Sequence, residues 1–200
     1  MPKSHTLFTK YTILSLIFLS VLVSCKKDSD PVLTDRVVSY NPVSSYSAQS
    51  IEFALGIQSL VIPELQSVIE NVSTGITVYR INYKTLYKDS VITASGIMSV
   101  PQTAGTYPVI SFQNGTNTLH ANAPSVNFDN ETFLLIEFLA SNGYIVLIPD
   151  YIGFGASSDI LHPYYHREST NNAIIDLIHA VKELGESGAI NVNASGGLFL

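Results

Sequence analysis

One segment near the middle of the chain constrains the fold more than any other. Residues 144–148 form an unbroken apolar run, Tyr-Ile-Val-Leu-Ile, which Pro149-Asp150 ends. A run without polar alternation is typical of a parallel strand that is covered on both faces of a sheet. Gly153 and Gly155 follow and favour a tight loop. The sequence therefore predicts a buried strand followed by a glycine loop.

Strands and helices alternate around this segment. Residues 76–83 and 91–100 are rich in β-forming side chains and flank a short polar link, as the strands of an antiparallel hairpin do. The elements predicted next, in chain order, are a strand at 107–112, a helix at 130–141, the strand at 144–148, a helix at about 169–184 and a strand opening at 197–200. This order predicts an α/β fold with flanking helices, in which a mostly parallel sheet carries an antiparallel edge hairpin.

Local signals set the expected helix ends. Asp129 is a candidate N-cap for the helix at 130–141, and Asn142-Gly143 is a typical stop. Upstream, residues 47–71 have helical periodicity. Pro63 interrupts this stretch and restarts it, because proline suits the first turn of a helix.

The composition suits a domain with a sizeable core. Apolar residues make up 46% of the chain and charged residues only 13%. The net charge is −6, and no basic stripe is present that could neutralise phosphates. We therefore expect no nucleic-acid partner.

The first 25 residues are typical of a secretion signal. Lys3 and Lys10 precede an apolar run at 11–23, which is short for a membrane span of about 20 residues. The run ends in Leu-Val-Ser before Cys25, which resembles the lipobox of bacterial lipoproteins, where the cysteine takes a lipid. Cys25 is the only cysteine, so no intrachain disulfide can form. The alternative is an ordinary secretory signal with a chance cysteine.

The lipobox divides the chain into three parts. Residues 1–25 are expected to be a lipoprotein signal peptide, 26–45 a flexible tether, and 46–200 the folded domain. The tether begins Lys-Lys-Asp-Ser-Asp, a composition typical of solvated linkers. Acyl chains such as palmitate at Cys25 would anchor the protein in the bacterial cell envelope, at the outer membrane or the cell surface.

Two loops leave the carboxyl ends of predicted strands, where ligands bind in parallel α/β sheets. The first loop begins Gln-Asn-Gly-Thr at residues 113–116. Gly115 allows the backbone to approach a substrate closely. The alternative is that Asn114-Gly115 makes only a turn.

This first loop resembles the Gln-His-Gly-Thr segment of secretory lipases and related bacterial esterases, which belong to the α/β-hydrolase superfamily. In that family the segment donates a backbone N–H to the oxyanion hole. The resemblance implies that Thr116 is the donor and that Gly115 shapes the turn. Asn114 stands where histidine is usual and cannot titrate.

The second loop extends the resemblance. Residues 144–157 contain a hydrophobic strand, Pro-Asp-Tyr and Gly-x-Gly-x-Ser in order, and His-Pro-Tyr follows at 162–164. Asp150 is expected to bind loop amides, because the acid of the family's catalytic triad follows later strands. The residues to which the resemblance assigns loop or pocket structure are Asn114, Asp150, Tyr151, Gly153, Gly155, His162 and Tyr164.

A metal site is not expected. His162 and His166 are four residues apart, but Pro163 disfavours a helical conformation at His162. No third ligand with suitable spacing accompanies them, and zinc needs three or four. We expect these histidines to cap the following helix or line a pocket. The resemblance implies no organic cofactor.

The nucleophile of the family is not recognisable in the chain. A serine elbow needs Gly-x-Ser-x-Gly at a turn from strand into helix, and neither Ser157 nor Ser195 has this setting. We therefore expect the catalytic serine, acid and histidine to follow Leu200. Residues 46–200 would then be the N-terminal part of an α/β-hydrolase domain, without activity alone.

The resemblance implies a parent protein that is an envelope-anchored serine hydrolase, cleaving small carboxylic esters or lipids. A prolyl-oligopeptidase-like peptidase uses the same scaffold and is one alternative. A second alternative, of another class, is a surface lipoprotein that binds a ligand or partner without catalysis.

Overall fold

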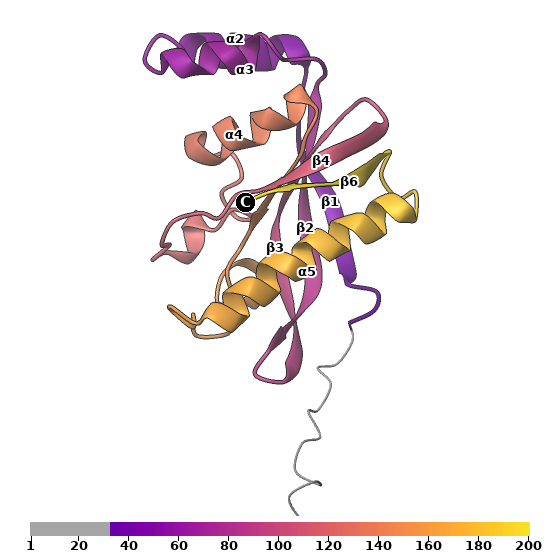
Figure 1. The fold of residues 1–200 in the computed structure, drawn as a ribbon. Coiled ribbons are helices and arrows are strands. Elements are labelled where there is room, and N and C mark those ends of the chain that lie inside the picture. Colours follow the sequence, from indigo (N-terminus) through magenta and orange to yellow (C-terminus); the bar gives the residue numbers. More distant parts are fainter. Residues whose placement is uncertain (1–32) are drawn as a thin grey trace, which may run out of the picture. The chain divides into compact units, whose positions relative to one another are not determined.

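A six-stranded sheet organises residues 33–200, the part of the chain that the computed structural model describes (Figure 1). The predicted signal peptide, Cys25 and residues 26–32 of the predicted tether lie outside the described residues. Among the helices of the described part, none has the length and hydrophobicity needed to cross a membrane.

The strand order is β1-β2-β3-β5-β4-β6. The strands are β1 (Val37–Tyr46), β2 (Ile76–Tyr87), β3 (Ser90–Pro101), β4 (Gly105–Ser111), β5 (Ile145–Pro149) and β6 (Val192–Phe199). β2 is antiparallel to β1 and β3, and β3 is antiparallel to β5. β4 is parallel to both β5 and β6. The α/β class and the hairpin are confirmed, and the described part of the sheet is mixed.

Helices cover both faces of this sheet (Figure 1). The helices are α2 (Ala48–Gln58), α3 (Gln66–Ile69), α4 (Glu131–Glu137) and α5 (Arg167–Glu186), with short 3₁₀ turns at Pro63–Leu65, His120–Asn122, Phe138–Asn142 and Gly155–Ser157. Alternate residues of β5 supply the two cores: Ile145 and Leu147 pack with α5, whereas Val146 and Ile148 pack with α2 and α4. The unbroken apolar run of β5 is thus explained by burial on both faces.

The predicted tether is too long. Its residues 37–45 belong to β1, which pairs with β2 from Val37 opposite Tyr83 to Tyr46 opposite Ile76. The ladder shifts register between Pro42 and Ser44, because proline cannot donate a ladder hydrogen bond. Burial along this edge strand is only partial, so its sequence lacks a clear alternating pattern.

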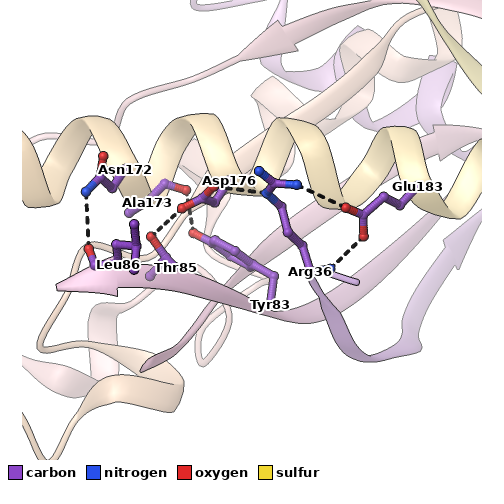
Figure 2. A network of polar contacts seen from close by, with 8 residues as sticks. All are labelled: Arg36, Tyr83, Thr85, Leu86, Asn172, Ala173, Asp176 and Glu183. Atoms are coloured by element: carbon purple, nitrogen blue, oxygen red, sulfur yellow. Dashed lines mark hydrogen bonds and ion pairs between the residues drawn. The ribbon is translucent and has the colours of Figure 1, made fainter. Parts of the chain in front are cut away.

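A polar network fixes the start of β1 against α5 (Figure 2). Arg36 Nε donates to Asp176 Oδ1 at 3.0 Å, and its Nη1 lies 3.2 Å from Glu183 Oε1. Thr85 Oγ1 donates to Asp176 Oδ2 at 2.8 Å, and the Tyr83 hydroxyl donates to a carbonyl of α5 at 2.7 Å. Since Asp176 is almost fully buried, Arg36 and Thr85 satisfy its carboxylate where water cannot.

Two element boundaries differ from the predictions. The N-cap of α4 is Asn130, whose side chain accepts a hydrogen bond from the Thr132 amide, and not Asp129. β6 begins at Val192, earlier than the expected 197, because pairing with β4 holds residues of low β-propensity in the strand. The predicted stop is confirmed, since Gly143 ends its 3₁₀ turn at φ 88°.

Glu137 at the end of α4 is an unusual core residue. Its side chain is buried, and neither carboxyl oxygen has a hydrogen-bond partner among the described residues. Burial, together with the nearby charge of Asp129, raises the pKa of Glu137 to about 8. The folded chain therefore holds this carboxyl in its neutral form at neutral pH.

We predict that this carboxyl makes stability depend on pH. Between its ordinary pKa of 4.5 and about 8, the unfolded chain loses the Glu137 proton and the folded chain keeps it. Stability falls as pH rises through this window, by up to about 1.4 kcal/mol per pH unit from this group, and levels off above it. Denaturant unfolding from pH 4 to 9 should show a flatter profile for Glu137→Gln.

The control for this experiment is Glu131→Gln, because Glu131 is exposed on the same helix. It should keep the wild-type dependence. Parallel pH profiles for the wild type and Glu137→Gln would contradict the assignment.

Candidate functional site

Two loops leave the same edge of the sheet. β4 and β5 are parallel neighbours, with Val109 opposite Ile145 and Ser111 opposite Leu147. The segments that follow them, 112–130 and 150–166, therefore start side by side at the carboxyl ends of the strands, where α/β sheets bind ligands. The predicted parallel pairing of these strands is confirmed.

The carboxylate of Asp150 joins both loops to β3. Its Oδ1 accepts a hydrogen bond from the Ser125 amide of the first loop at 2.9 Å. Its Oδ2 accepts one from Ser95 Oγ of β3 at 2.5 Å. Ser95 Oγ in turn accepts from the Ala156 amide of the second loop at 2.7 Å. One buried side chain thus sets the relative position of three segments.

Opposing effects act on the pKa of the Asp150 carboxyl. Burial raises the pKa of the Asp150 carboxyl above its ordinary value, while the hydrogen bonds from Ser125 and Ser95 and the charge of Arg80 lower it. Arg80 Nε also donates to the Ser125 carbonyl at 2.7 Å, which fixes the same loop residue from its other side. Because both carboxyl oxygens accept hydrogen bonds, the arrangement suits a structural carboxylate.

Gly153 and Gly155 adopt backbone conformations that residues other than glycine rarely adopt. Their φ angles are 96° and 54°. A Cβ at Gly153 would lie 2.6 Å from the His162 backbone, and one at Gly155 would overlap Asp150 Oδ2 and Ser95 Oγ. The glycine loop therefore crosses other segments at distances that exclude any side chain.

The loop at 113–116 is attached to Tyr151 at Asn114 and exposed to solvent at Gly115 and Thr116. The Tyr151 hydroxyl donates to the Asn114 carbonyl at 3.0 Å. Asn114 is buried, and its Oδ1 has no hydrogen-bond partner within residues 33–200. Gly115 and Thr116 are exposed, and the Thr116 amide donates no hydrogen bond to any described backbone group. An N–H at this position is available to a bound oxygen atom.

The histidines of the second loop have separate tasks. His162 Nδ1 lies 2.6 Å from the Ile152 carbonyl, so this nitrogen carries a proton. His166 caps α5, because its Nδ1 accepts from the Ser169 amide at 3.2 Å. Nowhere in residues 33–200 do three His, Cys, Asp or Glu side chains gather as a metal site would require.

Tyr164 reaches the first loop. The neighbouring side chains of Thr116 and Tyr165 lower the pKa of the Tyr164 hydroxyl below its ordinary value. The structure thus brings Tyr164 to Thr116, Tyr151 to Asn114, and Gly153 to His162. Each contact joins residues singled out in different parts of the sequence.

Neither serine cluster forms an elbow. Ser157 Oγ accepts from the Gly153 amide and donates to the Phe154 carbonyl, each at 3.0 Å, which stabilises the glycine loop. Ser195 lies inside β6, whereas an elbow serine follows its strand.

Sequence reasoning missed Ser95, Ser125 and Arg80. No motif marks them, although the run Ala94-Ser95-Gly96 offered a signal. Small residues inside a strand often mark a close approach of another backbone, and a Cβ at Gly96 would lie 2.7 Å from the Ile148 carbonyl oxygen.

We predict that Gly155→Ala is more damaging than Gly188→Ala. Both glycines have positive φ, but a Cβ at Gly188 meets open space. Gly188→Ala should cost only the left-handed strain, roughly 1–2 kcal/mol. Gly155→Ala should cost roughly 2–5 kcal/mol in denaturant unfolding, because overlap with Asp150 and Ser95 adds to that strain. Equal losses would show that the crossing is not tight.

Comparisons with known proteins bear on the fold. No protein-family model and no curated protein matched the chain. A solved structure of a Legionella pneumophila protein classed as a hydrolase is similar, with 30% identity and a TM-score of 0.66, over 79% of this chain and 42% of that one. The rice cell wall degrading esterase LipA from Xanthomonas oryzae is similar with 26% identity and a TM-score of 0.66, over 82% of this chain and 40% of LipA.

A ligand-bound form of the same LipA esterase has a TM-score of 0.65 and 26% identity. The chain spans about two fifths of the length of these solved proteins. The neighbours indicate a hydrolase fold. The strand order and the parallel β4–β5 and β4–β6 pairs are consistent with it. The described residues have the α/β-hydrolase fold.

Proposed function

We propose that this chain supplies the scaffold and one oxyanion-hole donor of a serine esterase. The observation that carries the proposal is the exposed Thr116 amide, which has no partner among the described backbone groups. It follows β4, and β6 runs parallel beside β4, with Ile110 opposite Phe199. A nucleophile that follows β6 would therefore start from the same edge of the sheet as the Thr116 loop.

The proposed chemistry is acyl transfer through a covalent intermediate. A serine after Leu200 attacks the ester carbonyl, and a histidine takes the serine proton and passes it to the leaving alcohol. The Thr116 N–H stabilises the negative oxygen of the tetrahedral intermediate, with a second donor from the residue after the nucleophile. Asp150 takes no part as the triad acid, because Ser125 and Ser95 occupy its oxygens. Residues 26–200 alone should then hydrolyse no ester.

The neighbours support an ester as the substrate. LipA is a cell wall degrading esterase by its description, and the Legionella protein is classed as a hydrolase. The description of LipA as an esterase favours an ester bond, in a small carboxylic ester or a lipid, over a peptide bond. An oxyanion donor stabilises the tetrahedral intermediate of ester and of peptide hydrolysis alike. Assays with both substrate types therefore decide between an esterase and a peptidase.

We also propose that the protein is a lipoprotein of the bacterial cell envelope. Support comes from the basic N-terminus, the apolar run and Cys25. Residue 33 starts the described unit eight residues after Cys25, and an extended chain of that length reaches at most about 29 Å. A lipid at Cys25 would hold the hydrolase unit close to the membrane surface.

The oxyanion-hole role predicts that the amide of Thr116 matters more than its side chain. In the full-length protein, Thr116→Pro removes the N–H and should lower kcat on p-nitrophenyl acetate by roughly 10²–10³-fold. Thr116→Ser keeps the amide and the hydroxyl and should retain a rate close to the wild type. A Thr116→Pro enzyme with normal kcat and circular dichroism would refute the role.

The anchor predicts that Cys25 takes acyl chains. In cells fed an alkyne analogue of palmitate, the full-length protein should become labelled and sediment with membranes. Cys25→Ala should remove the label. Label retained by this variant, or never found in the wild type, would favour the ordinary secretory signal.

A further inference from the structure

A row of aromatic rings extends from the candidate oxyanion loop across the second loop. We call it the aromatic row; its members are His120, Phe154, His162, Tyr164 and Tyr165. The centroid distances between successive rings are 5.4, 4.9, 6.0 and 4.4 Å. These spacings are those of aromatic rings in mutual contact.

The outer end of the row is open to solvent. Tyr164 is 55% exposed and Tyr165 is 91% exposed. Leu161, three residues before Tyr164, and Leu119, next to His120, are also exposed. Large apolar side chains grouped at an exposed position mark an interaction surface more often than isolated ones do. Their location at the carboxyl edge of the parallel strands is where this fold class binds ligands.

Tyr165 adopts a strained backbone conformation in this exposed position. Tyr165 has a φ of 59° at the third position of a turn closed by a hydrogen bond from the His166 amide to the Pro163 carbonyl at 3.0 Å. That position favours glycine or asparagine, and a bulky residue there is an outlier. Strain of this kind concentrates at ligand sites, where the surrounding structure maintains it.

The row starts on the loop that carries the proposed oxyanion donor, Thr116. His120 of that loop contacts Phe154 of the second loop, with 5.4 Å between the ring centroids. An ester carbonyl bound at the Thr116 amide would therefore lie on the loop from which the row starts. From His120 the row passes through the buried Phe154 and the half-buried His162 to the exposed Tyr164 and Tyr165.

We propose that the aromatic row binds a flat apolar group of the substrate, so that the enzyme prefers esters with an aromatic acid or alcohol. This inference rests on the proposed function for the position of the reacting bond. The binding itself requires only the row. Aromatic faces and edges at these spacings suit a further ring better than a flexible chain, because a rigid ring loses less conformational freedom when it stacks.

The test uses the full-length protein and the fluorescent aromatic alcohol 2-naphthol, with binding measured by equilibrium dialysis. We expect saturable binding to the wild type. The double variant Tyr164→Ala/Tyr165→Ala should weaken it roughly fivefold to fiftyfold, the effect of losing two ring contacts. Tyr164→Phe/Tyr165→Phe keeps both rings and should bind as the wild type does.

The matched control is Phe53→Ala. Phe53 is an exposed aromatic residue of α2. This helix follows β1 and lies outside both loops in the sequence. This variant removes an exposed ring elsewhere and should leave binding unchanged. Circular dichroism and thermal melting of all variants exclude unfolding as the cause of any loss.

A readout with substrates completes the experiment. The ratio of kcat/KM for 2-naphthyl acetate to that for ethyl acetate should fall in the double alanine variant. No saturable binding to the wild type, or equal binding to both double variants, would overturn the proposal while leaving the esterase assignment intact. If 2-naphthol binding behaves as expected but no ester is cleaved, the row stands as a binding site and the proposed function fails.

Discussion

The site depends on the hydrogen bonds that the buried carboxylate of Asp150 accepts. Ser125 of the first loop and Ser95 of β3 donate to it, and Ser95 binds the Ala156 amide of the glycine loop. Burying a charge is costly unless hydrogen bonds replace its water. Here two donors and the charge of Arg80 oppose the effect of burial on the pKa of Asp150. Asp150, which the sequence places in a loop of the candidate site, thus links β3 to both loops.

The order of the strands explains why this link is needed. β4 lies between β5 and β6, so the chain leaves β4, forms β5 on one side and returns past β4 to form β6 on the other. The loops after β4 and β5 therefore leave the same edge of the sheet and meet at Asp150 and Ser125. Gly155 makes this close approach possible, since a Cβ there would overlap Asp150 and Ser95 and lie 2.8 Å from Ser125 Oγ, whereas Gly153 lets the second loop fold back against its own His162. Gly115 and Thr116 remain at the surface.

Much of the fold could be predicted from local chemistry. Burial on both faces gave β5 its unbroken apolar run, and helical periodicity marked α5 because one face packs on the sheet. β1 was missed, since an edge strand with Pro42 in its ladder shows little alternation. The early start of β6 was missed because Ser195, Gly196 and Gly197 form a strand only where β4 supplies the partner.

The candidate site was predictable only in part, for a related reason. Asp150 and the glycines stand in a motif that the sequence displays. Their partners Ser95, Ser125 and Arg80 come from distant positions and acquire their role only when β2, β3 and the first loop meet. The row from His120 to Tyr165 likewise joins two loops that are separate in the sequence.

The central claim is that the Thr116 loop serves a serine nucleophile that this stretch of sequence does not contain. Labelling the full-length protein with a fluorophosphonate, followed by peptide mapping, tests it most directly. We predict one labelled serine, in a peptide that follows Leu200. Absence of label, or a label on a serine within residues 33–200, would contradict the account.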